Sequence, residues 1–298
     1  MSQLSDRGYQ GKKDFPILID LIARFRPPEH RLDFPNKVDL EEAFASATVR
    51  KNARLWLEDD VPVGWAYVDE YNNLIWEMDN RYEGLIGKEI IQWGELCVRR
   101  SLPKGRTGLL QANCRADHTS RMAFLQRHGF RKLEETTVTL RRELSDPLPE
   151  PELPAGFVVR SVTGKEEAAA VAAMHRAALG TEYMTTENRL IIMSTSGYDP
   201  LLDLVVVAPN GQIVANCICS VNPQERVGFT DPISTHPEFQ RLGLARALLL
   251  TGLKLLRERG MTSARLGTSG DNFAMQRAAR SAGFRIEYAT IWFSKEVK

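Results

Sequence analysis

Two stretches of this sequence that lie 154 residues apart carry the same order of local signals, and this repeat constrains the fold more than any other feature. One stretch starts at Arg115 and the other at Ser269, and each predicts a short helix, a glycine that ends it, and a strand. We interpret the repeat as a duplicated domain. The alternative is that any helix ending in glycine before a strand produces this pattern. Five identities fall in register: Asp117 with Asp271, Gly129 with Gly283, Phe130 with Phe284, Arg131 with Arg285, and Thr136 with Thr290.

A proline-rich segment separates the two halves. Leu144–Gly156 contains four prolines and no aromatic residue, a composition that favours extended backbone and disfavours helix. A length of 298 residues also fits two domains. We therefore expect a first domain over residues 1–145, a linker over 146–155 and a second domain over 156–298.

Charge and hydropathy exclude several classes of partner. With 39 Lys and Arg against 38 Asp and Glu, the net charge of +1 provides no overall field for nucleic acid or an anionic membrane. The longest apolar stretch, 242–256, is interrupted by Arg246 and Lys254 and predicts a core helix, not a membrane span. The first residues contain no apolar leader segment, so we expect a cytoplasmic protein without nucleic-acid or membrane partners.

The cysteines do not predict a disulfide framework or a metal site. Cys97, Cys114, Cys217 and Cys219 are scattered, and no Cys or His cluster has the spacing of zinc ligands. We expect buried thiols and no metal.

The second half predicts a mixed α/β sheet. Strands are expected at 157–162, 263–268 and 284–297, and helices at 165–179, 242–259 and 272–282. The apolar runs within 201–221 flank Asn210-Gly211, a pair typical of a tight hairpin turn. A third strand follows and is interrupted at Pro232, which cannot donate to a strand ladder. The order is antiparallel at first and then β-α-β-α-β.

The segment Gln240–Ala245 lies between a strand and a strongly apolar helix. A helix N-terminus leaves about four N–H groups unpaired and carries roughly half a positive charge, so it can bind a diphosphate if no side chain blocks the approach. Gly243 and Ala245 are small, and Arg241 and Arg246 add positive charge. The alternative is a tight turn packed on a neighbouring strand.

The sequence from His236 to Leu250 resembles motif A of the GNAT acyltransferase superfamily, and Asn272 to Phe284 resembles motif B. The resemblance covers Phe157 to the C-terminus and implies a GNAT domain that uses acetyl-CoA as co-substrate. It implies that Asn272 contacts the pantetheine arm and that backbone near Ile233, Ser234 and Thr235 binds the thioester carbonyl. It assigns the diphosphate to Gln240, Arg241, Leu242, Gly243, Leu244, Ala245 and Arg246.

The first half resembles a degenerate copy of the same domain. A hairpin is expected over 54–70 around Asp59-Asp60, then a strand over 72–80 and a helix over 84–100. Trp56, Trp65, Trp76 and Trp93 are expected as core or interface anchors.

The diphosphate loop of this first copy is altered. If Gly87 is aligned with Ala245, Leu85 stands at the position of Gly243 and Tyr82 at the position of Gln240. If Arg81 leads the motif instead, Ile86 takes the last small position. In either register we expect a branched side chain to screen the N–H groups, and hence weak or no coenzyme binding.

Asp231 is the best candidate for the base, because similar GNAT sequences carry an acid before proline at this position, and a carboxylate can accept the proton of an amine. The alternative is an Asp that bonds local N–H groups at a proline turn. Many GNAT enzymes place a tyrosine acid seven residues after the motif B asparagine, where this chain has Ala279. Spacing does not select among Tyr183, Tyr288, Ser269 or water as its substitute.

The acceptor pocket of the family is built by the first helices and loops, here around Leu179–Met184. Glu182 could pair with an ammonium group and Tyr183 could stack, although a solvated loop acid is the simpler interpretation. The sequence therefore predicts an acetyl-CoA-dependent N-acyltransferase, a monomer or homodimer, whose acceptor is an amine of a small molecule or peptide that attacks the thioester directly. The alternative is a non-catalytic protein that binds or senses acyl-CoA.

Overall fold

The computed structural model describes residues 3–195 and 197–298, which form two compact units. The first unit contains the described residues up to Glu135 together with Thr290–Lys298, and the second contains those of Thr136–Ala289. These units differ from the expected domains 1–145 and 156–298. Residues 136–143 of the first sequence half lie in the second unit, and residues 290–297 of the second half lie in the first unit.

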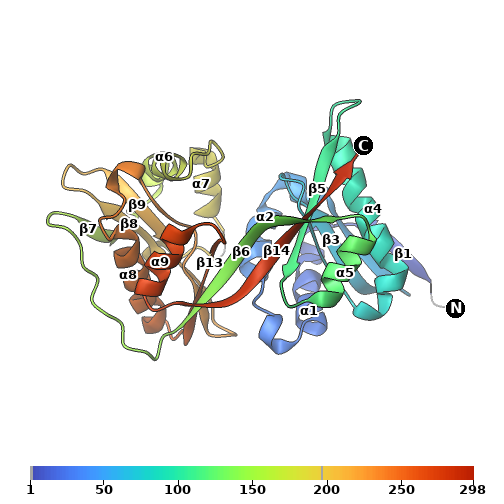
Figure 1. Ribbon diagram of the computed structural model, residues 1–298, viewed down its shortest axis with the longest axis horizontal. Coiled ribbons are helices and arrows are strands. Elements are labelled where there is room, and N and C mark those ends of the chain that lie inside the picture. The colour runs from blue at the N-terminus through green and yellow to red at the C-terminus, as the bar shows by residue number, and fades with distance from the viewer. Residues whose placement is uncertain (1–2, 196) are drawn as a thin grey trace. The chain divides into compact units, whose positions relative to one another are not determined.

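The first unit is built around an antiparallel sheet with the strand order β1-β2-β3-β4 (Figure 1). Its strands β2 and β3 form the expected hairpin, in which Asp59 and Asp60 both adopt positive φ. The strands are β1 (Leu4–Gly8), β2 (Ala53–Glu58), β3 (Val61–Val68), β4 (Leu74–Met78), β5 (Gly108–Arg115) and the start of β6 (Arg131–Glu143). The helices are α1 (Phe15–Phe25), α2 (Lys37–Ala45), α3 (Ala47–Lys51), α4 (Glu83–Ser101) and α5 (Thr119–Arg127), with short 3-10 turns at Gly11–Lys13, Pro28–His30 and Asn80–Tyr82.

Alternate residues of this sheet enter two cores. Trp56 and Trp76 pack with α4 and α5, whereas Trp65 and Ile75 pack with α1 and α2. The expected anchors are therefore core residues, since Trp56, Trp65 and Trp76 are almost fully buried and Trp93 is 9% exposed.

The second unit repeats this plan. The order β12-β9-β8-β7 forms an antiparallel sheet, while β10 pairs with β11 and β11 runs parallel to β13. The strands are β7 (Val158–Ser161), β8 (Asp203–Val207), β9 (Ile213–Ile218), β10 (Ser220–Asn222), β11 (Val227–Phe229), β12 (Ile233–Thr235), β13 (Ser263–Ser269) and the start of β14 (Arg285–Val297). The helices are α6 (Ala168–Leu179), α7 (Thr186–Ile192), α8 (Leu244–Glu258) and α9 (Phe273–Ser281), with 3-10 turns at Lys165–Glu167, Pro200–Leu202 and Pro237–Phe239.

Helices cover both faces of the second unit's sheet. Leu204 and Val206 of β8 pack with the leucines of α8, while Val205 between them packs with Met174 of α6. The helix α8 is a core helix, as the sequence predicted, and its apolar face supplies six buried leucines to this core.

Each unit is completed by a strand from the other half of the sequence. In the second unit, β6 pairs antiparallel with β13 from Thr137 opposite Ser269 to Glu143 opposite Ser263. In the first unit, β14 pairs antiparallel with β5 from Thr290 opposite Arg115 to Val297 opposite Gly108. The local pattern of a strand does not specify which sheet it joins, so the sequence did not reveal this exchange.

The proline-rich segment packs on the second unit. Residues 144–157, all of them described, form neither helix nor strand, as expected. Leu144 is buried in the core of α8, and its N–H donates to the carbonyl of Thr262 at 2.8 Å. Lys254 of α8 forms an ion pair with Glu150 at 2.5 Å. The segment is therefore anchored along this part of its length.

Two further expectations concern the described residues. All four cysteines are buried free thiols, as predicted. None of the described helices combines the length and the apolar character that a membrane crossing requires.

Candidate active site

Two neighbouring strands separate in the middle of the second unit. β11 runs parallel to β13 as far as Phe229 opposite Arg265, and the N–H of Thr230 donates to the Arg265 carbonyl at 3.1 Å. After Pro232 the chain continues as β12, which is the edge strand of the sheet formed with β9. The interruption that the sequence placed at Pro232 is therefore confirmed, and beyond it β12 and β13 are no longer paired.

The separated strand presents backbone groups to this space. Pro232 accepts from the N–H of Ile218, and the N–H of His236 donates to Val214, so the even-numbered residues bond to β9. By the alternation of an antiparallel ladder, Ile233 and Thr235 direct their N–H and C=O groups away from β9. These two residues are thus suited to bind an extended polar chain or a carbonyl oxygen.

Ser234 has a different position from its two neighbours. Its side chain is buried and donates to Asn216 Oδ1 at 2.6 Å, beside Met174 of α6. It anchors β12 to the sheet. Of the three residues expected near the thioester, only Ile233 and Thr235 have the orientation for that role.

The loop that follows β12 forms an open turn at the N-terminus of α8. Arg241 and Gly243 both adopt positive φ, at 63° and 80°. Among the described residues, no side chain caps the helix, and the first bond back to Gly243 comes from the N–H of Ala247 at 3.0 Å. The N–H groups of residues 244–246 are therefore left for another acceptor.

The space above this loop suits a diphosphate. Gln240, Arg241, Leu242 and Gly243 are exposed, and a Cβ built on Gly243 would meet no atom within 4 Å. The first turn of α8 contains no acid, and Arg246 and Arg241 are the nearby cations. Leu244 is buried in the core, so only its backbone remains available.

The equivalent turn of the first unit is organised differently. α4 begins at Glu83, two or three residues earlier than α8 in the two alignments, so Gly84 already lies within the helix where α8 still has its open loop. Ile86 is buried in the core, and the expectation that it screens the N–H groups is therefore wrong. Leu85 is 57% exposed, and the acids Asp79 and Glu83 lie at this helix N-terminus. The negative charges of these two carboxylates disfavour the binding of an anion at this helix N-terminus.

Asn272 caps α9 through its side-chain oxygen, which accepts from the N–H of Met275 at 3.0 Å. Its amide nitrogen makes no hydrogen bond within the described residues and stays exposed. His118 caps α5 in the same way, by accepting from the N–H of Arg121 at 3.2 Å. The paired caps support the alignment of the two copies.

Asp231 lies where the strands separate. Its Oδ2 accepts from the N–H of Gly267 on β13 at 2.9 Å, so the carboxylate links the two strands at this point. The residue is still exposed to solvent, yet the protein around the carboxyl removes enough hydration to raise the pKa of Asp231 to about 6. A carboxylate with this pKa is a better proton acceptor than an ordinary aspartate.

The structure does not supply a tyrosine at residue 279. Ala279 is fully buried in the core beneath α9, so no side chain there faces the strand separation. Among the substitutes, Tyr183 is 52% exposed, Tyr288 is half-buried on β14, and Ser269 Oγ accepts from the N–H of Asp271 at 3.2 Å.

Glu182 and Tyr183 lie on the exposed loop between α6 and α7. Asn188 donates to the Tyr183 carbonyl at 2.8 Å, and Arg176 donates to the Met184 carbonyl at 2.6 Å. The loop is thus held in place, and α6 packs against β12 through Met174 and Ser234. The carboxylate of Asp231 accepts from Gly267 of β13, an element other than the loop that carries Glu182 and Tyr183.

A buried polar cluster beside this loop was missed by the sequence analysis. Arg189 of α7 forms an ion pair with Asp203 at the start of β8, and the hydroxyl of Tyr198 donates to the same carboxylate at 2.6 Å. Burial raises the pKa of Asp203. The cluster fixes α7 to the sheet. The helix 186–192 also contains Thr186, Glu187 and Asn188, so Arg189 did not stand out in its local sequence.

The fold and part of the sequence are similar to those of known proteins. Residues 169–284 match the acetyltransferase (GNAT) family. The whole chain shares its fold with a GCN5-related N-acetyltransferase from Sphaerobacter thermophilus (TM-score 0.75, 22% identity, 99% of this chain and 96% of that one). It also shares its fold with a tandem GNAT protein from the clavulanic acid biosynthesis pathway (TM-score 0.74, 16% identity, 100% and 99% coverage). The fold is that of two GNAT domains in tandem.

Among individual proteins, the chain is similar to a mycothiol acetyltransferase from Streptomyces bingchenggensis. The two are 32% identical over 175 residues, which is 56% of this chain and 55% of that one. The matched part thus spans about half the length of the first such relatives.

Proposed function

We propose that the second unit is an acetyl-CoA-dependent N-acetyltransferase. The observation that carries the proposal is the uncapped N-terminus of α8 beside the separation of β12 and β13. The unpaired N–H groups of residues 244–246 would hold the diphosphate. The exposed amide of Asn272 would contact the pantetheine arm, and Ile233 and Thr235 would bind its polar groups and the thioester oxygen.

In the proposed reaction, the acceptor amine attacks the thioester carbonyl carbon. The new C–N bond forms, the C–S bond breaks, and coenzyme A leaves as a thiolate. Asp231, directly or through one water, takes the proton that the amine must lose, since an amine of pKa about 10 is mostly protonated at neutral pH. The thiolate takes a proton from water or from the acceptor ammonium, because Ala279 provides no acid.

The proposed acceptor is a small-molecule or peptide amine. The loop with Glu182 and Tyr183 is the proposed place of its recognition, because α6 connects this loop to the packing of β12. The name of the similar proteins makes mycothiol-related amines the first members of an acceptor panel.

One observation favours a second candidate, a protein that binds acyl-CoA without turnover. The position of the usual acid is a buried alanine. Release of free coenzyme A from acetyl-CoA over the amine panel separates the two functions. Calorimetry with acetyl-CoA alone tests the shared part: we expect one site per chain, and two sites would contradict the proposed loss of binding in the first unit.

A further inference from the structure

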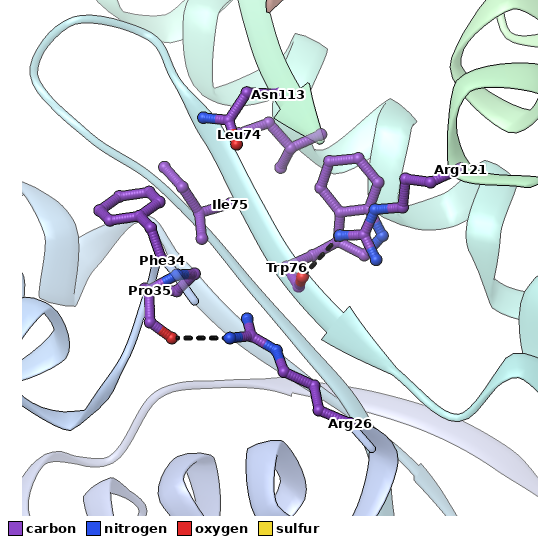
Figure 2. Close-up of a pocket in the computed structure, with 8 residues that line it drawn as sticks. All are labelled: Arg26, Phe34, Pro35, Leu74, Ile75, Trp76, Asn113 and Arg121. Carbon is purple, nitrogen blue, oxygen red and sulfur yellow. Dashed lines mark hydrogen bonds between the residues drawn. The ribbon is translucent and has the colours of Figure 1, made fainter. Parts of the chain in front are cut away.

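The first unit contains a small cavity beside the strands that correspond to those of the active site. It has a volume of about 40 Å³ and opens between β4 and the segment that follows α1 (Figure 2). This volume holds about three water molecules or a ligand of similar size. The lining residues are Arg26, Phe34, Pro35, Leu74, Ile75, Trp76, Asn113 and Arg121.

Two guanidinium groups line the cavity and share one carboxylate. Arg26 Nε lies 2.5 Å from Glu77 Oε2, while Arg121 Nη1 lies 3.9 Å from Glu77 Oε1, beyond hydrogen-bond distance. Glu83 also acts on Arg121 but pairs with Arg127, while Asp33 and Asp117 both pair with Arg115. Glu77 is therefore shared by the two cations, and the Arg121 guanidinium also lies over the Trp76 ring, 3.8 Å from its centroid. One carboxylate between two guanidinium groups leaves a net positive charge at the cavity.

Some polar side-chain atoms of the lining residues form no hydrogen bond within the described residues, and most of these atoms are donors. Arg26 Nη1 donates to the carbonyls of Asp33 and Pro35, and Arg121 Nη2 to that of Trp76 at 2.8 Å (Figure 2), but Arg26 Nη2 has no acceptor within the described residues. The buried Trp76 Nε1 has none either. The side-chain amide of Asn113 makes no hydrogen bond in the described part of the chain. A ligand of this cavity must supply acceptor atoms.

The opposite lining is apolar. Phe34, Pro35, Leu74 and Ile75 contribute hydrocarbon surface, and Phe34 is half exposed at the surface. A planar anion with a short apolar end fits both halves, because a carboxylate matches the fork of a guanidinium group.

The residues of the second unit that align with Asn113 and Arg121 have a different chemistry. At the repeat spacing of 154 residues, Asn113 aligns with Gly267 and Arg121 with Met275. The polar side chains are thus specific to the first copy. We propose that the first unit binds a short-chain monocarboxylate, such as acetate or propionate, in this cavity, through Arg26, Arg121 and Asn113. The proposal is independent of catalysis in the second unit.

The test uses the full chain and measures its thermal midpoint and its isoleucine and leucine methyl NMR signals. Sodium acetate is titrated against sodium chloride at equal ionic strength, and against acetamide, which has the same shape without the charge. We expect a saturable rise of the midpoint and shifts at Ile75 and Leu74 with acetate only. Equal effects of acetate and chloride, or of acetate and acetamide, would overturn the proposal.

A matched pair of variants locates the site. Asn113→Leu removes an amide that has no partner, so the fold should persist, and loss of one hydrogen bond to a charged ligand should weaken acetate binding by about tenfold or more. Asn80→Leu makes the same change at an exposed position of the same unit and should bind acetate like the unchanged chain. Acetate affinity that is unchanged in Asn113→Leu would contradict the assignment.

Discussion

The guanidinium group of Arg142 lies in the space that a side chain at residue 283 would occupy. Arg142 donates to the carbonyls of Ala282 and, at 2.7 Å, Pro147, and Gly283 has a φ of 87°. A residue from the first half of the sequence therefore closes the end of α9 in the second unit. Lys295 of β14 lies over Gly129 at the end of α5 in the first unit, so both exchanged strands make this contact.

Gly283→Ala should be strongly destabilising. The methyl group would displace the guanidinium group of Arg142 from the carbonyls of Ala282 and Pro147 and would also force positive φ on alanine, at about 1–2 kcal/mol for the conformation and about 1–3 kcal/mol for the buried groups left unpaired. Urea unfolding measures the sum. Gly211→Ala is the control, because Gly211 has a φ of 84° and nothing within 4 Å. Equal losses in the two variants would show that the contact with Arg142 does not matter.

A fragment of residues 150–298 should fail to fold cooperatively. It lacks residues 137–143, which pair with β13, and it lacks Arg142. A fragment that begins at residue 131 retains this strand and should be more stable. Circular dichroism with thermal unfolding compares the two, and a stable, cooperative 150–298 fragment would refute this role of β6.

Local elements were predictable because their signals are local. Asn210-Gly211 specified the hairpin of β8 and β9, Pro232 specified the break between β11 and β12, and the apolar run at 242–256 specified α8. The exchange of β6 and β14 was not predictable. The partner of each strand lies more than 100 residues away, and the residue pattern of a strand does not specify such a distant partner. The boundaries expected at 145 and 156 missed it for this reason.

Asp231→Asn should lower kcat/KM for the best amine by about 10²–10⁴. The activity of the unchanged protein should rise as pH increases through about 6, where Asp231 loses its proton. The activity of the variant should not show this rise. The same shift has an opposite effect on stability. A native pKa raised from 3.8 makes the folded state bind the proton more tightly, so stability falls as pH rises through this range, and the Asn variant should lose that dependence.

Gly267→Ala tests the position of the base without changing its chemistry. A Cβ at residue 267 would lie 3.3 Å from Asp231 Oδ2, close enough to displace the carboxylate by a few tenths of an ångström. We expect kcat to fall by about tenfold, while the affinity for acetyl-CoA is retained, since the diphosphate loop is not involved. A variant with unchanged kcat would indicate that the carboxylate position is not critical.

Gly243→Leu should abolish most coenzyme binding. The side chain would fill the open space above the loop, and the φ of 80° disfavours leucine, so the N–H groups of α8 would be screened or displaced. Calorimetry with acetyl-CoA measures the loss, which we expect to be at least about tenfold. Gly84→Leu at the start of α4 is the control in the first unit and should have no effect on coenzyme affinity.

The site was predictable where it depends on backbone. Gln240–Ala245 and Asn272 lie where the motifs placed them, because a helix N-terminus requires a particular local sequence. The opposed roles of Ser234 and its neighbours depend on the pairing of β12 with β9, and the Arg189–Asp203 cluster depends on packing across the unit. Neither arrangement follows from local sequence.

The strand exchange also sets the order of events during synthesis on the ribosome. β5 is translated well before residues 290–297, so the first unit waits, on the order of ten seconds at typical elongation rates, for the strand that pairs with β5. Until then β5 has an unpaired edge that is open to aggregation or to chaperones. The domain that leaves the ribosome first is therefore completed last, and a chain that stopped before residue 290 would leave the first unit without the strand that pairs with β5.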